Sequence, residues 1–164
     1  MDYKENSSDF TIVNEAISSY VLNSPFSFNK ENITFSEFFD NKMLIIQVIK
    51  SGLPFKIFNA IKSIIPFTEE DWANYLNIST KSLQRYSNDA NFVFKPIHTE
   101  KIIEIAEVNN LGKEVFNSTE QFYLWLNTPS YALNNLKPAE LIKDSYGKEL
   151  VMEELNRIEH GIFA

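Results

Sequence analysis

The chain has 164 residues, enough for one compact unit or two small ones sharing a core, and 44% of them are hydrophobic, as in an ordinary folded protein. It has no cysteine, which excludes disulfides, thiolate metal sites and a thiol nucleophile, and suits a reducing cytoplasm. The net charge of −7 argues against indiscriminate nucleic-acid binding. The N-terminus is polar, and apolar runs such as Met43–Ile46 are far shorter than the ~20 helical residues that cross a bilayer. We therefore expect a cytoplasmic protein without a membrane anchor.

Residues 1–33 give mixed signals and are interpreted as a variable N-terminal arm. Their apolar spacing favours a short amphipathic helix from Phe10 to Leu22, followed by the helix-breaking cluster Asn23-Ser24-Pro25. No function follows from this segment.

Helical spacing becomes regular at Thr34. Apolar residues recur three and four positions apart up to Gly52, which predicts a helix that ends there. These residues are Phe35, Phe38, Phe39, Leu44, Ile45, Val48 and Ile49. Pro54 stands where the first turn of a helix tolerates proline, and an apolar stripe from there to Pro66 predicts the next helix.

Two short helices are predicted next. Thr68-Glu69-Glu70-Asp71 is a capping box that begins a helix reaching Tyr75, because the hydroxyl accepts from free backbone amides and the acids favour the helix dipole. Leu76-Asn77-Ile78 is a tight connection, and Ser79 caps a second helix from Thr80 to Tyr86. Two short helices joined by a three-residue turn are the outline of a helix-turn-helix.

The C-terminal part of the chain also has a helical pattern. A helix is predicted from Thr99 to Asn109, with a break or kink at Asn109–Gly112. Ser118 with Gln121 forms a second capping box, which begins a helix that ends before Pro129. Lys137-Pro138 begins a further helical turn.

The last predicted helix follows Gly147 and ends at Gly161. It has Val151, Leu155 and Ile158 on one face, and Glu153 and Arg157 at the spacing of an ion pair. Strand alternation is sustained nowhere, so the predicted fold class is all-α.

The charge distribution limits where DNA could bind. Lys and Arg number three against seven Asp and Glu in residues 1–49, seven against five in 50–101, and five against ten in 102–164. Only the middle third is mildly basic, whereas the acidic end suits a basic protein partner. The second short helix offers Thr80, Lys81, Gln84 and Arg85, residue types that reach phosphates and base edges.

Few further cations, Lys56, Lys62 and Lys95, are available to support such binding, although dimerisation would double the charge. From the pattern alone, a helical hairpin with a solvated outer side is therefore an equal alternative. The tail Ile162-Phe163-Ala164 is apolar where most chains fray, so it either folds back onto the core, the simpler alternative, or docks elsewhere.

A specific order of residues runs through the C-terminal third. It comprises Val115-Phe116, Trp125-Leu126 with Pro129, Leu133, Leu136-Lys137-Pro138 with Glu140-Leu141, Gly147, Val151, Leu155 and Arg157-Ile158-Glu159-His160-Gly161. Upstream lie Gly52-Leu53-Pro54, Leu76-Asn77-Ile78-Ser79, Leu83-Gln84-Arg85 and Thr99-Glu100-Lys101. Over residues 34–164 the sequence resembles the Xre/MbcA/ParS-type antitoxins, with their helix-turn-helix region and their toxin-binding domain.

This resemblance implies a helix-turn-helix region at 34–110 and a toxin-binding domain at 111–164. It implies a non-enzymatic homodimer without a cofactor, whose C-terminal helix and tail block the active-site entrance of a RES-type toxin that consumes NAD. The antitoxin would also repress its own operon. The residues that would bind the DNA are Ser79, Thr80, Lys81, Gln84 and Arg85. The toxin-binding residues would be Lys137, Glu153, Arg157, Glu159, His160, Gly161, Ile162, Phe163 and Ala164.

The residues agree with such a partner. Acidic groups near the C-terminus complement the basic pocket of an enzyme that grips a dinucleotide's phosphates, and Ile162 and Phe163 can fill an apolar slot. Trp125 and Leu155 are interpreted as core residues. Two features depart from the family: Leu133-Asn134-Asn135 replaces a Leu-Gly-Gly turn, which asparagine can still form, and His160 replaces an aromatic residue.

Two other classes of function were compared with this one. A stand-alone helix-turn-helix regulator would need no toxin and would bind its own promoter. An enzyme is the weakest alternative, because the two histidines, His98 and His160, lack metal-ligand spacing and the four glycines form no phosphate loop.

Overall fold

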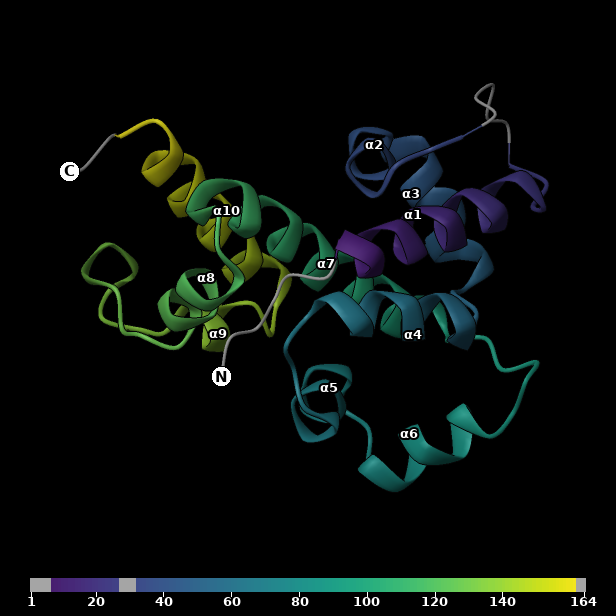
Figure 1. The fold of residues 1–164 in the computed structure, drawn as a ribbon. Helices are drawn as coiled ribbons and strands as arrows, with labels where there is room; N and C mark the ends of the chain where they lie inside the picture. Colours follow the sequence, from purple (N-terminus) through teal and green to yellow (C-terminus); the bar gives the residue numbers. More distant parts are fainter. Residues whose placement is uncertain (1–6, 27–31, 162–164) are drawn as a thin grey trace. The chain divides into compact units, whose positions relative to one another are not determined.

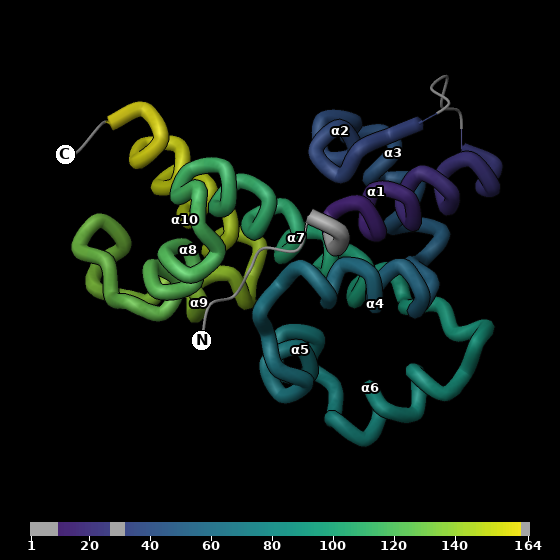
Figure 2. Tube along the Cα trace, viewed as in Figure 1, coloured from purple at the N-terminus to yellow at the C-terminus, as the bar shows by residue number. Residues whose placement is uncertain are grey.

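The computed structural model describes residues 7–26 and 32–161, which contain helices and turns but no strand, as the all-α prediction requires. The chain divides into two compact units, residues 1–102 and 103–164 (Figure 1). Their boundary falls inside one helix, α7 (Pro96–Phe116), whose course is followed in Figure 2. Of the helices described, none combines the length and the apolar character needed to cross a lipid bilayer.

The first unit begins with α1 (Ser7–Leu22), which confirms the short N-terminal helix predicted from Phe10 to Leu22. This helix packs along α4 (Phe55–Ile64), where Val13, Ile17 and Val21 are buried. The side-chain oxygen of Asn14 also accepts a hydrogen bond of 2.7 Å from the Phe35 amide. The segment interpreted as a variable arm therefore contributes a helix to the core of this unit.

The single helix predicted from Thr34 to Gly52 is wrong in one respect. The structure has two helices, α2 (Phe35–Asp40) and α3 (Lys42–Ser51), separated at Asn41. The Asn41 side chain accepts from the Leu44 amide at 3.0 Å and so caps the second helix. The spacing of the buried apolar residues, Phe35 and Phe38 in α2 and Leu44 and Val48 in α3, continues across this break. Periodicity alone therefore could not locate it.

Gly52-Leu53-Pro54 lies against the segment that precedes α7. The Phe94 amide donates to the Leu53 carbonyl at 2.9 Å, and the buried hydroxyl of Thr99 accepts from the Leu53 amide at 3.0 Å. Gly52 has a φ of 81°, and a Cβ there would lie 2.4 Å from the Phe94 carbonyl oxygen. Only glycine fits this position, which fixes the start of α4 against the rest of the unit.

Aromatic rings fill the centre of the first unit. Phe58 of α4 contacts Trp72 and Phe94 edge to face, with ring centroids 5.1 and 5.0 Å apart, and all three side chains are buried. Trp72 belongs to α5 (Glu69–Leu76), so this cluster joins the helix-turn-helix to the helices before it.

The second unit consists of the end of α7, α8 (Thr119–Leu126), the short 3-10 helix η1 (Tyr131–Leu133), α9 (Pro138–Leu141) and α10 (Ser145–Glu159). Of the predicted break or kink at Asn109–Gly112, the break is wrong, because α7 continues through these residues. A Cβ on Gly112 would lie 2.1 Å from the Phe122 ring, so this glycine admits the ring rather than ending the helix. Leu155 is fully buried and Trp125 is half-buried against Phe116.

Candidate functional site

The helix-turn-helix is built by caps that the sequence predicted. Thr68 and Asp71 form the reciprocal capping box of α5, with backbone-to-side-chain hydrogen bonds of 2.8 and 3.1 Å. Asn77 takes the left-handed conformation in the turn, and the Ile78 amide donates to the Ala73 carbonyl at 3.0 Å. Ser79 accepts from the Ser82 amide at 3.0 Å and caps α6 (Thr80–Ser87).

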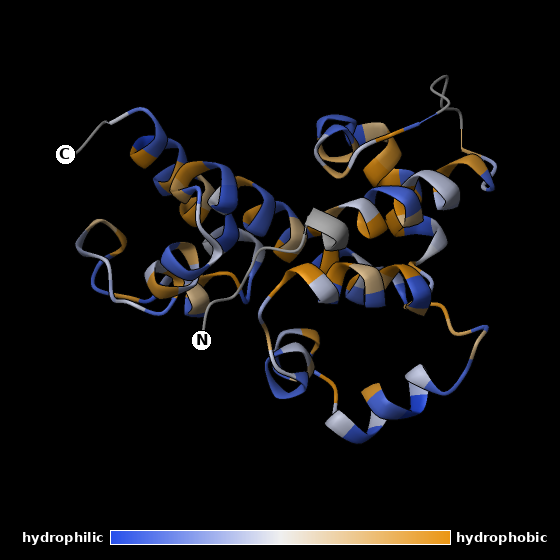
Figure 3. Cartoon of the chain, in the orientation of Figure 1, coloured by the Kyte–Doolittle hydropathy of each residue, from blue (hydrophilic) through white to orange (hydrophobic). Residues whose placement is uncertain are grey.

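Helix α6 presents its predicted DNA-binding residues to solvent. Leu83 is its buried residue, and Figure 3 shows the helix as mostly hydrophilic. Thr80, Lys81, Gln84 and Arg85 are all exposed. Lys81 and Arg85 are four residues apart on the face opposite Leu83, Gln84 follows Leu83, and Thr80 lies in the first turn. Ser79 is also exposed, at the N-terminus of the same helix.

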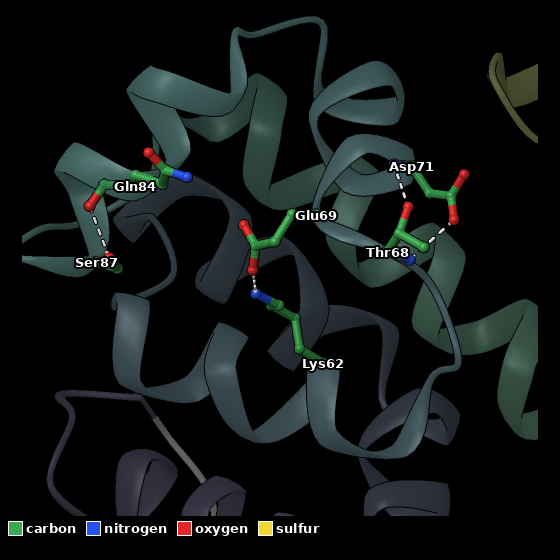
Figure 4. A network of polar contacts seen from close by, with 6 residues as sticks. All are labelled: Lys62, Thr68, Glu69, Asp71, Gln84 and Ser87. Atoms are coloured by element: carbon green, nitrogen blue, oxygen red, sulfur yellow. Dashed lines mark hydrogen bonds and ion pairs between the residues drawn. The ribbon is translucent and has the colours of Figure 1, made fainter.

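The supply of free cations beside this face is smaller than the sequence indicated. Lys62 forms an ion pair with Glu69 (Figure 4) and also lies over the Phe58 ring, with 5.5 Å from Nζ to the centroid. Arg85 lies over the neighbouring Tyr86 ring at 5.5 Å, while Tyr86 stacks on Phe92 at 3.8 Å. The guanidinium is thus held beside a packed aromatic pair.

The two histidines lie in different units and have different surroundings. His98 packs edge to face on Phe94, and burial together with the charge of Lys95 lowers the pKa of its ring. His160 lies just after α10, where its Nδ1 is 2.7 Å from the Asn156 carbonyl oxygen. Among the described residues, no cluster of three or more ligand-type side chains could hold a metal ion.

In the second unit, the N-terminal half of α10 is fixed by four contacts. Asp144 caps the helix through the Gly147 amide at 2.8 Å, Ser145 donates to Glu104 at 3.2 Å, and Lys148 pairs with Glu107 at 2.7 Å. A Cβ on Gly147 would lie 1.9 Å from the Leu141 carbonyl oxygen, so α9 approaches very closely. The prediction that Gly147 precedes the helix is therefore wrong; it lies inside the helix to admit α9.

The C-terminal half of α10 and the two residues after it carry most of the predicted toxin-binding residues that the structure describes. Glu153, Glu159, His160 and Gly161 are exposed. Arg157 is half-buried and pairs with Glu154 at 2.7 Å, so the predicted Glu153–Arg157 pair is wrong. Both glutamates lie at a spacing that suits a helical ion pair, and Arg157 pairs with the one three residues earlier.

The rest of the predicted toxin-binding set comprises Lys137 and the last three residues of the chain. Lys137 is exposed at the start of α9, away in sequence from the helix end. Ile162, Phe163 and Ala164 lie outside the described residues.

The turn before α9 keeps its shape without glycine. Asn134 and Asn135 have φ of 57° and 62°, the left-handed values that asparagine tolerates, as predicted for this departure from Leu-Gly-Gly. The Asn135 amide donates to the Ser130 carbonyl at 2.8 Å and closes the loop.

Sequence reasoning missed two exposed apolar residues of α10. Tyr146 is 84% exposed and Leu150 is 47% exposed, although both lie on a helix whose other face is in the core. Their spacing of four residues, outside the register of Val151 and Leu155, is the signal that could have found them.

Comparison with known proteins matches two family models to the chain. The model of the "Antitoxin Xre-like helix-turn-helix domain" matches residues 44–107, and that of the "Antitoxin Xre/MbcA/ParS C-terminal toxin-binding domain" matches residues 111–161. The curated protein "Antitoxin Xre" of Yersinia enterocolitica is 23% identical over 123 residues, which cover 74% of this chain and 82% of that protein.

A solved structure shares the fold. A chain of the crystal structure of the M. tuberculosis MbcT–MbcA toxin-antitoxin complex superposes with a TM-score of 0.53 at 21% identity, covering 65% of this chain and 94% of that one. The two family models together span most of the described residues, and they fall on the helix-turn-helix of the first unit and on the helices around α10. The chain belongs to the Xre/MbcA/ParS antitoxin family, as an antitoxin with a helix-turn-helix domain and a C-terminal toxin-binding domain.

Proposed function

We propose that this antitoxin neutralises a RES-type, NAD-consuming toxin by covering the toxin's active-site entrance with the end of α10 and the residues that follow it. The observation that carries the proposal is the toxin-binding family model, which ends at Gly161, directly after the exposed acidic end of α10. The solved structure with a similar fold is a complex of a toxin with its antitoxin, which supports a toxin as the partner.

Charge supports this partner. Residues 103–164 contain ten Asp and Glu but five Lys and Arg. An enzyme that binds the two phosphates of NAD needs a positively charged pocket, and an acidic protein surface is attracted to it. Glu153 and Glu159 are exposed, so they can make this contact without first leaving the core of the unit.

Deletion of Gly161–Ala164 tests the proposal. Cells that express the neighbouring toxin should be rescued by the full antitoxin and not by the deleted chain, because the entrance is left open. Removal of Asp2–Asn6, a deletion of similar size at the other end, is the control and should leave rescue unchanged. Full rescue by the chain that lacks Gly161–Ala164 would contradict the proposal.

We also infer that a homodimer represses its own operon through α6. The support is the exposed face of Thr80, Lys81, Gln84 and Arg85, whose side chains suit a major groove. A dimer would present two such helices to half-sites about one DNA turn, ~34 Å, apart and would double the cationic charge. Gel-shift titration of its own promoter tests this, with sedimentation to measure the oligomeric state.

A stand-alone regulator is the second candidate function, favoured by the same exposed face of α6. It predicts promoter binding without any toxin partner. Failure of the antitoxin to form a complex with the neighbouring toxin, together with specific promoter binding, would favour it.

A further inference from the structure

Helix α10 has an apolar pair on the side that faces solvent. Tyr146 and Leu150 lie four residues apart, so they are neighbours on the helix surface. The exposed fraction of Tyr146 is 84%, although the same helix buries Val151 and Leu155 completely. Glu149 and Glu153 are exposed next to the pair. This face therefore combines an aromatic ring and a leucine with acidic neighbours.

The part of α10 that carries the pair is fixed before any partner arrives. The N-terminal half of α10 is bound to α7 through Ser145–Glu104 and Lys148–Glu107 and approaches α9 closely at Gly147. These contacts hold the helix in its unit, while Tyr146 and Leu150 stay exposed. A rigid aromatic side chain on a fixed helix loses little conformational entropy on binding, which is typical of residues that dominate an interface.

The position of the pair indicates which partner would cover it. Tyr146 and Leu150 lie within residues 111–161, the part of the chain matched by the toxin-binding family model. From Tyr146 to Glu159 the helix rises about 20 Å, at 1.5 Å per residue. A tail that fills an active-site entrance does not need apolar contacts so far away. The pair would thus touch a part of the toxin outside its active site.

We propose that Tyr146 and Leu150 anchor the toxin on a surface outside its active site, so that affinity and inhibition reside at opposite ends of α10. This inference rests on the proposed function. The matching surface of the toxin would be an apolar pocket with a basic residue beside it, because the exposed, acidic Glu149 lies next to the pair. The anchor holds the complex together, and the C-terminal residues after α10 close the entrance.

The test measures binding and inhibition separately with the purified neighbouring toxin. Calorimetric titration should show that Tyr146→Ala with Leu150→Ala weakens binding about tenfold to a hundredfold, as loss of interface anchors does. The matched control is Met43→Ala with Ile46→Ala, which removes two exposed apolar residues from one face of α3 in the other unit. It should bind like the wild-type chain, and circular dichroism should show that both variants are folded.

The chain that lacks Gly161–Ala164 completes the test. It should still bind the toxin, with a smaller loss of affinity than the Tyr146 and Leu150 variant, yet at saturation it should leave NAD consumption uninhibited. Unchanged binding by the Tyr146 and Leu150 variant, with the wild-type chain bound, would overturn this inference alone. A wild-type chain that does not bind the toxin would overturn the proposed function as well.

Discussion

Asparagine takes the place of glycine in several turns of this protein. Asn77, Asn117, Asn134 and Asn135 all have φ between 52° and 62°, in a chain with only four glycines. Most L-residues avoid this conformation because Cβ approaches the following carbonyl oxygen, whereas asparagine compensates with local hydrogen bonds. The turn at Asn134 could be predicted because the family pattern requires it. The turn at Asn117 could not, since asparagine is equally common in ordinary loops.

Substitution of Asn134 tests this interpretation. Asn134→Gly should leave the free energy of unfolding nearly unchanged, while Asn134→Val should lower it by about 1–2 kcal/mol, because a β-branched residue resists the left-handed conformation. Denaturant titration measures both. Asn156→Val is the control, since Asn156 is exposed within α10, where the two residues have similar helix propensities. Equal stability of the Asn134 variants would contradict the account.

Gly112 makes a second residue-scale prediction. In an exposed helix Gly→Ala stabilises by about 1 kcal/mol, but here the new methyl group would meet the Phe122 ring. We therefore expect Gly112→Ala to lower the free energy of unfolding by about 1–3 kcal/mol, as overpacking does. In a protein that already carries Phe122→Leu, adding Gly112→Ala should lower the free energy of unfolding by less than it does in the wild type. A stabilised Gly112→Ala protein would show that the glycine is not required by the ring.

The lowered pKa of His98 predicts a pH dependence. The unfolded chain protonates this ring near its ordinary pKa of about 6.5, whereas the folded protein does so at lower pH because of burial and Lys95. The stability that the neutral ring contributes is thus fully present above the unfolded-state pKa of about 6.5, and it is lost as the pH falls through the lower, folded-state pKa. His98→Gln should lose less stability than the wild type between pH 7 and 5. Parallel curves for the two proteins would contradict this.

At the scale of elements, the sequence located the helix starts that carry a capping side chain better than the other helix boundaries. Thr68, Ser79 and Ser118 each cap the helix that their position predicted, because a cap is a local interaction between neighbouring residues. The errors at Gly112 and Gly147 share another cause. Each glycine lies inside a helix at a position where Phe122 or Leu141, a residue outside that helix, occupies the space of a Cβ. One sequence carries no direct signal of such contacts.

Helix α6 makes a prediction about DNA. Lys81→Ala should weaken promoter binding and reduce the slope of log affinity against log salt by about one, because one phosphate contact is lost. Gel-shift titrations at several salt concentrations measure the slope. Lys143→Ala is the control, since Lys143 is exposed in the other unit. The same slope for wild type and Lys81→Ala would place the DNA contact elsewhere.

At the scale of the whole molecule, the division into a mildly basic middle and an acidic end could be predicted from the sequence. The order of motifs also predicted the two domains, whose family models match residues 44–107 and 111–161. The exposed pair Tyr146 and Leu150 was missed, although its spacing falls outside the register of the buried Val151 and Leu155. The ion pair of Arg157 was misassigned since Glu153 and Glu154 both lie within reach by spacing.

The central claim is that this antitoxin binds the toxin encoded beside it and stops NAD consumption. Co-expression of the two proteins, followed by affinity purification and an NAD assay of the lysate, measures both parts at once. We predict that they co-purify and that the NAD level equals that of cells without the toxin. No complex and continued loss of NAD would contradict the account and leave promoter binding by α6 as the better explanation of the helix-turn-helix.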